Sequence, residues 1–191
     1  MARVEQPVLF FSSPADLEAW LEENGEASDG IWVKFAKKAS GIRSVVYGEA
    51  VELALCHGWI DGQVKRLDDD HYLQKFTPRR PRSNWSKINR EKAERLIAEG
   101  RMSPAGLREV ERAKEDGRWD DAFDPPTTAT VPDDFQSALD AEPAALEFFE
   151  SLAATKRYSF LYRIREAKRP ETRAKRIAEY VELLREGRTL V

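Results

Sequence analysis

The sequence has 191 residues, of which 41% are hydrophobic and 34% are charged, and its formal net charge is −3. This balance is typical of a folded globular protein with a strongly ionic surface, and it excludes an intrinsically disordered chain. No stretch approaches the roughly 18 consecutive apolar residues of a membrane span, and the single cysteine, Cys56, excludes an internal disulfide framework.

The N-terminal stretch MARVEQPVLFFSSPADLE has only a short apolar run, from Val8 to Phe11. It lacks the apolar core and the small-residue cleavage site of a secretory signal. Together with the cysteine content, this predicts a cytoplasmic protein.

The first half of the chain alternates between helix and strand patterns. Ser13 followed by Pro14 predicts a helix start, with serine as N-cap and proline at the first helical position. GIWVKFAK places Ile31, Val33 and Phe35 on one face and Trp32 and Lys34 on the other, which is the period of a half-buried strand. YGEAVELALCHG predicts a short apolar helix. WIDGQVKRL and HYLQKF predict two strands joined by the turn DDD, an antiparallel hairpin.

After Trp85 the pattern changes from strand to helix, and helical segments follow one another except in one stretch described below. Ser103-Pro104 repeats the helix start of Ser13-Pro14, and Pro132, Pro143 and Pro170 each precede a further helical segment. In KRYSFLYRIREAK and in the segment after Pro170, Leu161, Ile164, Ile177, Val181 and Leu184 have helical spacing and are predicted to be buried. The arginines between them, Arg163, Arg165, Arg173 and Arg176, are expected on solvent or inter-domain faces.

The stretch DDAFDPPTTATVP has three prolines and no helical or strand periodicity, so it is predicted to be a linker. The sequence therefore predicts an α+β fold with three parts. Residues 1–119 form an N-terminal antiparallel sheet with packed helices, residues 120–131 are a linker, and residues 132–191 are a small helical C-terminal domain.

Charge is segregated along the chain. Seven residues from Lys75 to Lys92 are basic and one is acidic, whereas nine from Glu115 to Glu142 are acidic and one is basic. Blocks of opposite sign either pair with each other or attract an external partner.

The densest basic stretch is FTPRRPRSNWS, residues 76 to 86, with Arg79, Arg80 and Arg82 beside two prolines and Trp85. Proline stiffens the loop, and arginines on a stiff loop lose less entropy when they bind an anion. Ser86 is a candidate cap for the next helix.

We therefore predict a ligand-binding site formed by Arg79, Arg80, Arg82 and Trp85 beside the segment HGWID, which contributes His57, Trp59 and Asp61. Asp61 and Glu49 are the expected internal partners of these arginines. The alternative is that Trp85 is a core anchor while the arginines pair with the acids after Glu115.

An enzyme would have to use Cys56, His57 and Asp61 as nucleophile, base and orienting group. A metal site would have to combine His57 and His71 with Asp68, Asp69 and Asp70, a spacing that matches no familiar ligand set. The glycines form neither a P-loop nor a dinucleotide fingerprint. We therefore predict no catalytic residues, no metal and no cofactor.

Two stretches, ALCHGWIDG with the following FTPRRPRSNWSKINREKAERLIAEGRM, and YSFLYRIREAKRPETRAKRI near the end, resemble the YdeI/OmpD-associated family, also called bacteriocin-protection proteins. The resemblance extends from about Val33 to Arg188. It implies a link to stress or bacteriocin protection.

Residues and resemblance together predict a non-catalytic, cytoplasmic binding protein. Its partner is unidentified. A small anionic ligand or an acidic protein surface fits the acidic pI near 5.6 better than a nucleic acid does. The alternative is an uncharacterised enzyme with a pocket near His57 and Asp61.

Overall fold

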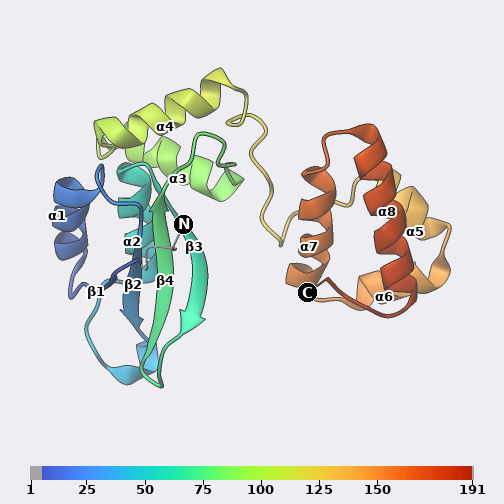
Figure 1. Cartoon of the computed structure of the whole chain (residues 1–191), viewed down its shortest axis with the longest axis horizontal. Helices are drawn as coiled ribbons and strands as arrows, with labels where there is room; N and C mark the ends of the chain where they lie inside the picture. The colour runs from blue at the N-terminus through green and yellow to red at the C-terminus, as the bar shows by residue number, and fades with distance from the viewer. Residues whose placement is uncertain (1–5, 191) are drawn as a thin grey trace. The chain divides into compact units, whose positions relative to one another are not determined.

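The computed structural model describes residues 6–190, and these divide into two units between Ala122 and Phe123 (Figure 1). The division falls inside the segment 120–131 that the sequence predicts as a linker. The first unit combines a sheet with helices and the second is helical, so the α+β prediction is confirmed.

Four strands form the sheet of the first unit: β1 (Val8–Phe10), β2 (Ile31–Ala36), β3 (Trp59–Arg66) and β4 (His71–Pro78), in the order β1-β2-β4-β3. The predicted hairpin is confirmed, because β3 and β4 pair antiparallel, and β2 also pairs antiparallel with β4. β1 is parallel to β2, which makes the sheet mixed rather than purely antiparallel. The cause is α1 (Pro14–Asn24), a crossover helix that returns the chain to the same end of the sheet.

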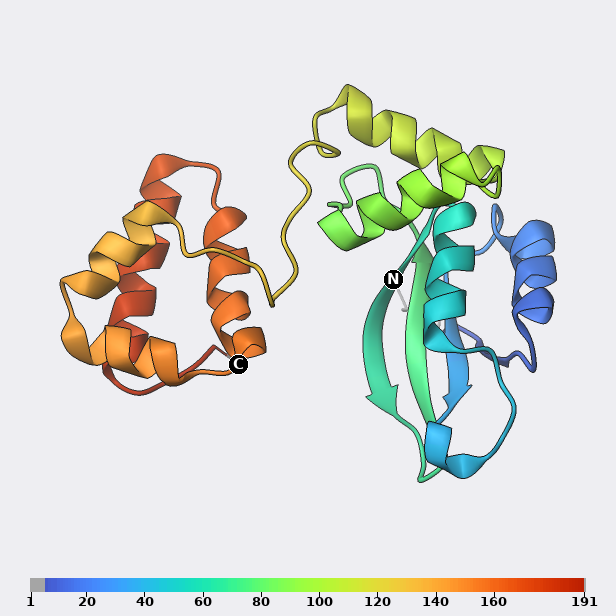
Figure 2. The same cartoon turned by 180° about the vertical axis from the view of Figure 1, so that it is seen from behind.

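Helices cover one face of this sheet. Ile31, Val33 and Phe35 of β2 are at most 1% exposed and belong to the core with α1 and α2 (Tyr47–Cys56). The helix α2 lies behind the strands in Figure 1 and in front of them in Figure 2, so it packs on one face only. Trp32 and Lys34 alternate with these core residues and lie on the opposite face.

Two further helices complete the first unit, α3 (Lys87–Ala98) and α4 (Pro104–Glu115). The predicted caps are confirmed: the hydroxyls of Ser13, Ser86 and Ser103 each accept a hydrogen bond from a backbone N–H in the first turn of α1, α3 and α4. The stretch that is rich in arginine is the connection from β4 to α3.

The second unit consists of α5 (Asp133–Asp140), α6 (Pro143–Ser151), α7 (Ala154–Arg165) and α8 (Pro170–Arg185). All five aliphatic residues predicted to be inward are buried. Arg173 spans two helices on the outside of this core, since it donates to both carboxylate oxygens of Asp134 and to the carbonyl of Ile164.

None of the helices within residues 6–190 has both the length and the apolar character needed to cross a membrane.

Candidate anion-binding site

The connection between β4 and α3 is fixed by its own hydrogen bonds. The backbone N–H of Arg79 donates to the carbonyl of Gly58 at 2.9 Å, which extends the pairing with the neighbouring strand by one residue. Arg80 and Ser83 then close a turn: the N–H of Arg80 donates to the Ser83 hydroxyl, and the N–H of Ser83 donates to the Arg80 carbonyl. These hydrogen bonds hold the loop in a defined turn.

Arg79 is turned inward. Only 6% of the residue is exposed, and its guanidinium carbon lies 3.5 Å from the centroid of the Trp85 ring. Nη1 donates to the carbonyl of Asn84 at 3.2 Å. Burial lowers the pKa of Arg79 to about 10, so the side chain is still charged at neutral pH.

The two tryptophans of the predicted site are core residues. Trp85 is 1% exposed and packs edge-to-face against Trp119 at 4.9 Å between ring centroids. Trp59 is also 1% exposed, and its indole N–H donates to the carbonyl of Gly25. Trp85 was predicted as a ligand-binding residue, but its burial agrees with the alternative, in which it anchors the loop on the core.

Arg80 and Arg82, in contrast, are exposed. Among residues 6–190, no ion pair joins Arg79, Arg80 or Arg82 to a carboxylate. The acidic stretch after Glu115 therefore does not neutralise them in the described part of the chain.

Asp61, expected to pair with one of these arginines, accepts a hydrogen bond of 2.6 Å from the hydroxyl of Tyr47. Burial, and then this contact, raise the pKa of the Tyr47 phenol well above its ordinary value. The other expected partner, Glu49, accepts from the backbone N–H of Val46 and caps α2. Both expectations were wrong for the same reason: each carboxylate has a nearer donor at the start of α2.

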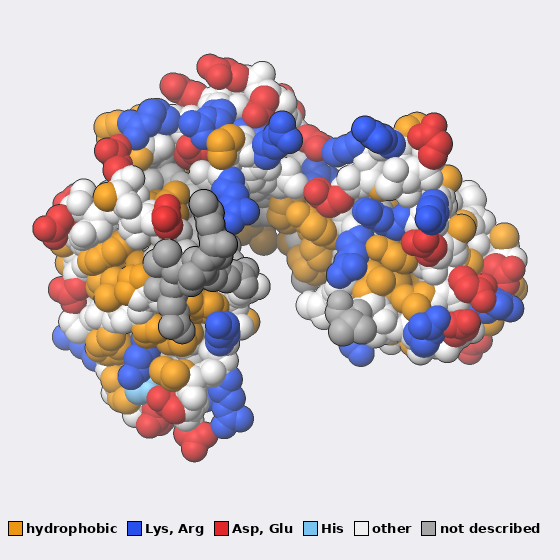
Figure 3. Space-filling model, viewed as in Figure 1, with side chains coloured by type: hydrophobic (Ala, Val, Ile, Leu, Met, Phe, Trp, Pro, Cys, Tyr) orange, Lys and Arg blue, Asp and Glu red, His pale blue; other side chains and the backbone are white. Residues whose placement is uncertain are grey.

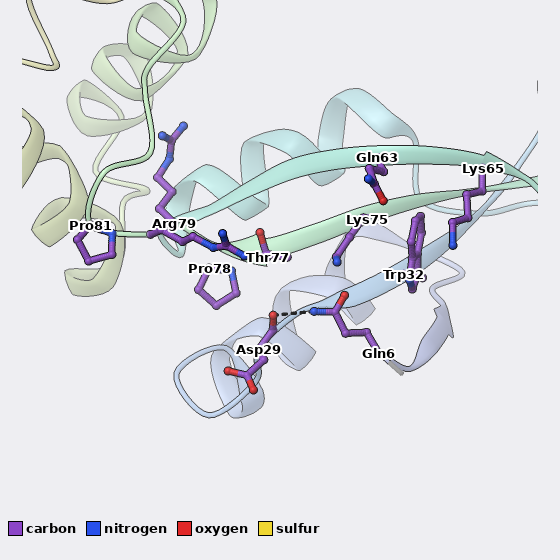
Figure 4. Close-up of a pocket in the computed structure, with 11 residues that line it drawn as sticks. Gln6, Asp29, Trp32, Gln63, Lys65, Lys75, Thr77, Pro78, Arg79 and Pro81 are labelled. Carbon is purple, nitrogen blue, oxygen red and sulfur yellow. Dashed lines mark hydrogen bonds between the residues drawn. The ribbon is translucent and has the colours of Figure 1, made fainter. Parts of the chain in front are cut away.

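A cavity of about 830 Å³ opens on the face of the sheet opposite α2 (Figure 4). Four cationic side chains and one acidic side chain line it, together with polar groups, a tryptophan and two prolines: Lys65, Lys75, Arg79, Arg80, Asp29, Gln6, Gln63, Thr77, Trp32, Pro78 and Pro81. Lysine and arginine side chains are visible along the edge of the first unit where β3 runs (Figure 3). The cavity therefore has an excess of positive charge.

Trp32 organises the cations of this cavity. The ammonium of Lys65 lies 4.3 Å from the centroid of the Trp32 ring, and the ammonium of Lys75 lies 5.9 Å from it. Trp32 and Lys75 are direct partners in the register of β2 and β4, and Lys65 pairs opposite Leu73 two residues away. Cation–π attraction to a tryptophan ring therefore restricts two side chains that are otherwise flexible.

Arg79 contributes to this cavity in a limited way. Its guanidinium contacts Trp85 and Asn84, and neither residue lines the cavity. Of the predicted ligand-binding residues, Arg79 and Arg80 line the cavity, whereas Arg82, Trp85, Trp59, Asp61 and His57 do not. Sequence reasoning missed Trp32, Lys65, Lys75, Gln63 and Thr77, although the alternation of β2 placed Trp32 and Lys34 on the face away from the core.

The candidate catalytic residues do not form a connected set. Cys56 is 3% exposed, and burial raises the pKa of its thiol, which lowers the fraction of nucleophilic thiolate. His57 follows the last residue of α2, and burial lowers the pKa of its imidazole. Within residues 6–190, no hydrogen bond joins the side chains of Cys56, His57 and Asp61, and none of the three lines the cavity on the sheet.

The candidate metal ligands are also separate. His71 and Asp68 form a local pair, with Nδ1 at 3.0 Å from Oδ1, at the turn between β3 and β4. In the part of the chain that the structure describes, no three His, Cys, Asp or Glu side chains are grouped so that they could hold a metal ion.

Comparison with protein families divides the chain in two. Residues 9–109 match the family described as "Domain of unknown function (DUF8412)". This match covers more than half of the sequence. The chain belongs to this family.

A second match covers residues 128–187, and its description is "Bacteriocin-protection, YdeI or OmpD-Associated". The closing stretch YSFLYRIREAKRPETRAKRI lies inside it, so that resemblance is confirmed. The stretches ALCHGWIDG and FTPRRPRSNWS lie instead in the DUF8412 match. No curated protein and no solved structure matched the chain.

The two matches separate the structural features by domain. The DUF8412 region contains β1 apart from Val8, the strands β2 to β4, the loop after β4, and all cavity-lining residues except Gln6. The YdeI/OmpD-associated region contains α5 to α8. The candidate anion site therefore belongs to the DUF8412 domain.

Proposed function

We propose that this member of the DUF8412 family is a non-catalytic binding protein that holds an anionic ligand in the cavity on the open face of its sheet. The observation behind the proposal is the lining of that cavity: Lys65, Lys75 and Arg80, with a limited contribution from Arg79, against one acid in a space of about 830 Å³. This volume lies within the range of small-molecule sites. We further propose that the protein acts in the cytoplasm, in the bacteriocin or stress protection that the description of its C-terminal domain suggests.

The ligand in this proposal has a phosphate or carboxylate group that contacts Lys65, Lys75 and Arg80. Trp32 holds the two lysines near their binding positions, which reduces the entropy lost when they engage an anion. Gln63 and Thr77 supply neutral hydrogen-bond donors on the same face. Asp29 at the rim disfavours an anion that extends past it.

The test is a titration of the full chain with sugar phosphates, nucleotides, dicarboxylates and short oligonucleotides, followed by tryptophan fluorescence and calorimetry. The double variant Lys65→Ala/Lys75→Ala should weaken binding of any ligand found by at least about tenfold, which corresponds to about 1.4 kcal/mol. The double variant Lys38→Ala/Arg43→Ala removes the same charge from residues that do not line the cavity, and it should bind like the wild type.

Equal affinity in both double variants would overturn the proposal, since binding would then follow net charge and not the cavity. An oligonucleotide that binds in preference to small anions, with a steep dependence on salt, would replace the small ligand by a nucleic acid.

A further inference from the structure

The loop after β4 and the segment after α4 contain a second set of cationic groups, which shares only Arg79 with the cavity. Among the described residues, four buried side-chain nitrogens near this loop have no hydrogen-bond partner: Arg79 Nε, Arg79 Nη2, Trp85 Nε1 and Arg118 Nη2. Leaving a buried donor unpaired costs about 1–3 kcal/mol, and more for a charged group. These atoms therefore require an acceptor.

The four atoms come from side chains that are held together. The guanidinium of Arg79 stacks on Trp85, and its Nη1 donates to the carbonyl of Asn84. Nη1 of Arg118 donates to the carbonyl of the preceding residue, Ser83, at 2.6 Å. Two arginines are thus fixed on adjacent carbonyls of one loop.

All four of these nitrogens without a hydrogen-bond partner are donors. A water molecule could accept from two of them, but it carries no charge to offset the buried guanidinium of Arg79. An oxyanion carries the opposite charge, and most or all of its oxygens accept hydrogen bonds. It therefore complements the set better than water does.

The geometry of Arg79 also favours an oxyanion. Its orphaned nitrogens, Nε and Nη2, form one edge of the planar guanidinium, and their N–H bonds run parallel. This edge is the fork that binds two oxygens of a phosphate, sulfate or carboxylate. The opposite nitrogen, Nη1, is the one that donates to the protein.

The charge of Arg79 is not balanced by a direct contact. Arg118 is paired with Asp116 at 2.8 Å, whereas Arg79 has no ion pair among residues 6–190. A buried cation without a partner is strongly unfavourable. Burial lowers the pKa of Arg79, and Glu109 acts on it only at longer range.

We propose that Arg79, Trp85 and Arg118 form a binding site for one small oxyanion, phosphate or sulfate, that is distinct from the cavity on the sheet. The Nε–Nη2 edge of Arg79 binds two oxygens, and Arg118 Nη2 and Trp85 Nε1 donate to the remaining ones. The bound anion joins the β4–α3 loop to the segment that follows α4. Its role is to complete the structure of the loop.

The test is calorimetric titration of the full chain with inorganic phosphate at low millimolar concentration, against sodium chloride at matched ionic strength. The wild type should bind one phosphate per chain. Arg79→Lys keeps a cation but loses the fork, and Arg118→Gln removes one donor. Each should weaken phosphate binding at least tenfold, whereas Lys38→Ala/Arg43→Ala, which removes cations outside both proposed sites, should bind phosphate like the wild type. The lysine variant Lys65→Ala/Lys75→Ala is titrated beside them.

The outcomes separate this site from the proposed cavity. Loss of phosphate binding in the lysine variant but not in the arginine variants would overturn the oxyanion site and leave the cavity proposal standing. Absence of phosphate binding to the wild type would also overturn it. A glucose 6-phosphate titration distinguishes the source of the phosphate group: binding of the ester but not of the free anion would refute a free-oxyanion site.

A second measurement uses only the wild type, so it tests the proposal even where the arginine variants fail to fold. Phosphate should slow hydrogen exchange at the backbone amides of residues 80–86 by at least about threefold in the wild type, because the anion fixes both ends of the loop. Unchanged exchange in this loop at saturating phosphate would contradict the proposal.

Discussion

Gly106 is the point where α4 touches the end of α2, and its substitution tests the packing of the first unit. A Cβ at this position would lie 2.3 Å from the carbonyl oxygen of Cys56 and 2.9 Å from its carbonyl carbon. Ordinary contact begins near 3.4 Å, so α4 would have to move by about 1 Å. The obstacle is backbone, which cannot turn aside as a flexible side chain can.

The cost of this movement can be estimated. Overpacking costs about 1–3 kcal/mol. The carbonyl of Cys56 also accepts from the N–H and the hydroxyl of Ser103, at 3.0 and 2.7 Å, and the same movement stretches both bonds. Each is worth about 0.5–1.5 kcal/mol. The gain in helix propensity from glycine to alanine, about 1 kcal/mol, acts in the opposite direction. We expect Gly106→Ala to destabilise the first unit by about 3 kcal/mol.

The assay is urea unfolding followed by tryptophan fluorescence. All five tryptophans, Trp20, Trp32, Trp59, Trp85 and Trp119, lie in the first unit, so the signal reports on that unit. With an m-value of about 1.5–2 kcal/mol/M, the midpoint should fall by about 1.5–2 M.

The matched control is Gly48→Ala, which lies in α2 with nothing within 4 Å of its added Cβ. It should leave stability unchanged or raise it by up to about 1 kcal/mol. If Gly106→Ala unfolds at the wild-type midpoint or above it, the close approach of α4 to α2 is incorrect.

Three further predictions concern the second unit and two titratable groups. Ile177→Asp places a charge in the core of the second unit, so its helical circular dichroism should fall while tryptophan fluorescence stays native; an unchanged spectrum would contradict the helical register. Hydrogen bonds from Arg173 lower the pKa of Asp134. The contribution of these bonds to the stability of the second unit is therefore complete above pH 3.8, the ordinary pKa, and is lost as the pH falls through the lowered pKa. Asp134→Asn should therefore cost up to about 1 kcal/mol at pH 7 and almost nothing in strong acid, measured by urea unfolding of the helical signal; an equal cost at both pH values would refute this ion pair. Burial lowers the pKa of His57, so the first unit should lose stability as pH falls below about 6.5, and His57→Gln should flatten that slope in fluorescence-detected unfolding; parallel slopes would show that His57 is not responsible.

Local patterns in the sequence determined most of the elements. A serine before or near a helix start, an alternating apolar run, and proline followed by a periodic segment each act through a few neighbouring residues. The caps at Ser13, Ser86 and Ser103, the β3–β4 hairpin and the helices of the second unit were therefore predicted correctly. The strand β1 was not predicted, because its three residues are stabilised by pairing with β2 and not by their own pattern.

The candidate site depended on contacts that no local pattern encodes. Trp32, Lys65 and Lys75 come from three different strands, and only the register of the sheet places them around one cavity. Arg79 and Arg80 are adjacent and chemically identical in the sequence, yet one is buried against Trp85 and the other is exposed. The sequence by itself determined where helices and strands form and that this loop is strongly cationic. Only the tertiary structure decided which cations face solvent and which lie inside, because burial depends on packing between segments that are far apart along the chain.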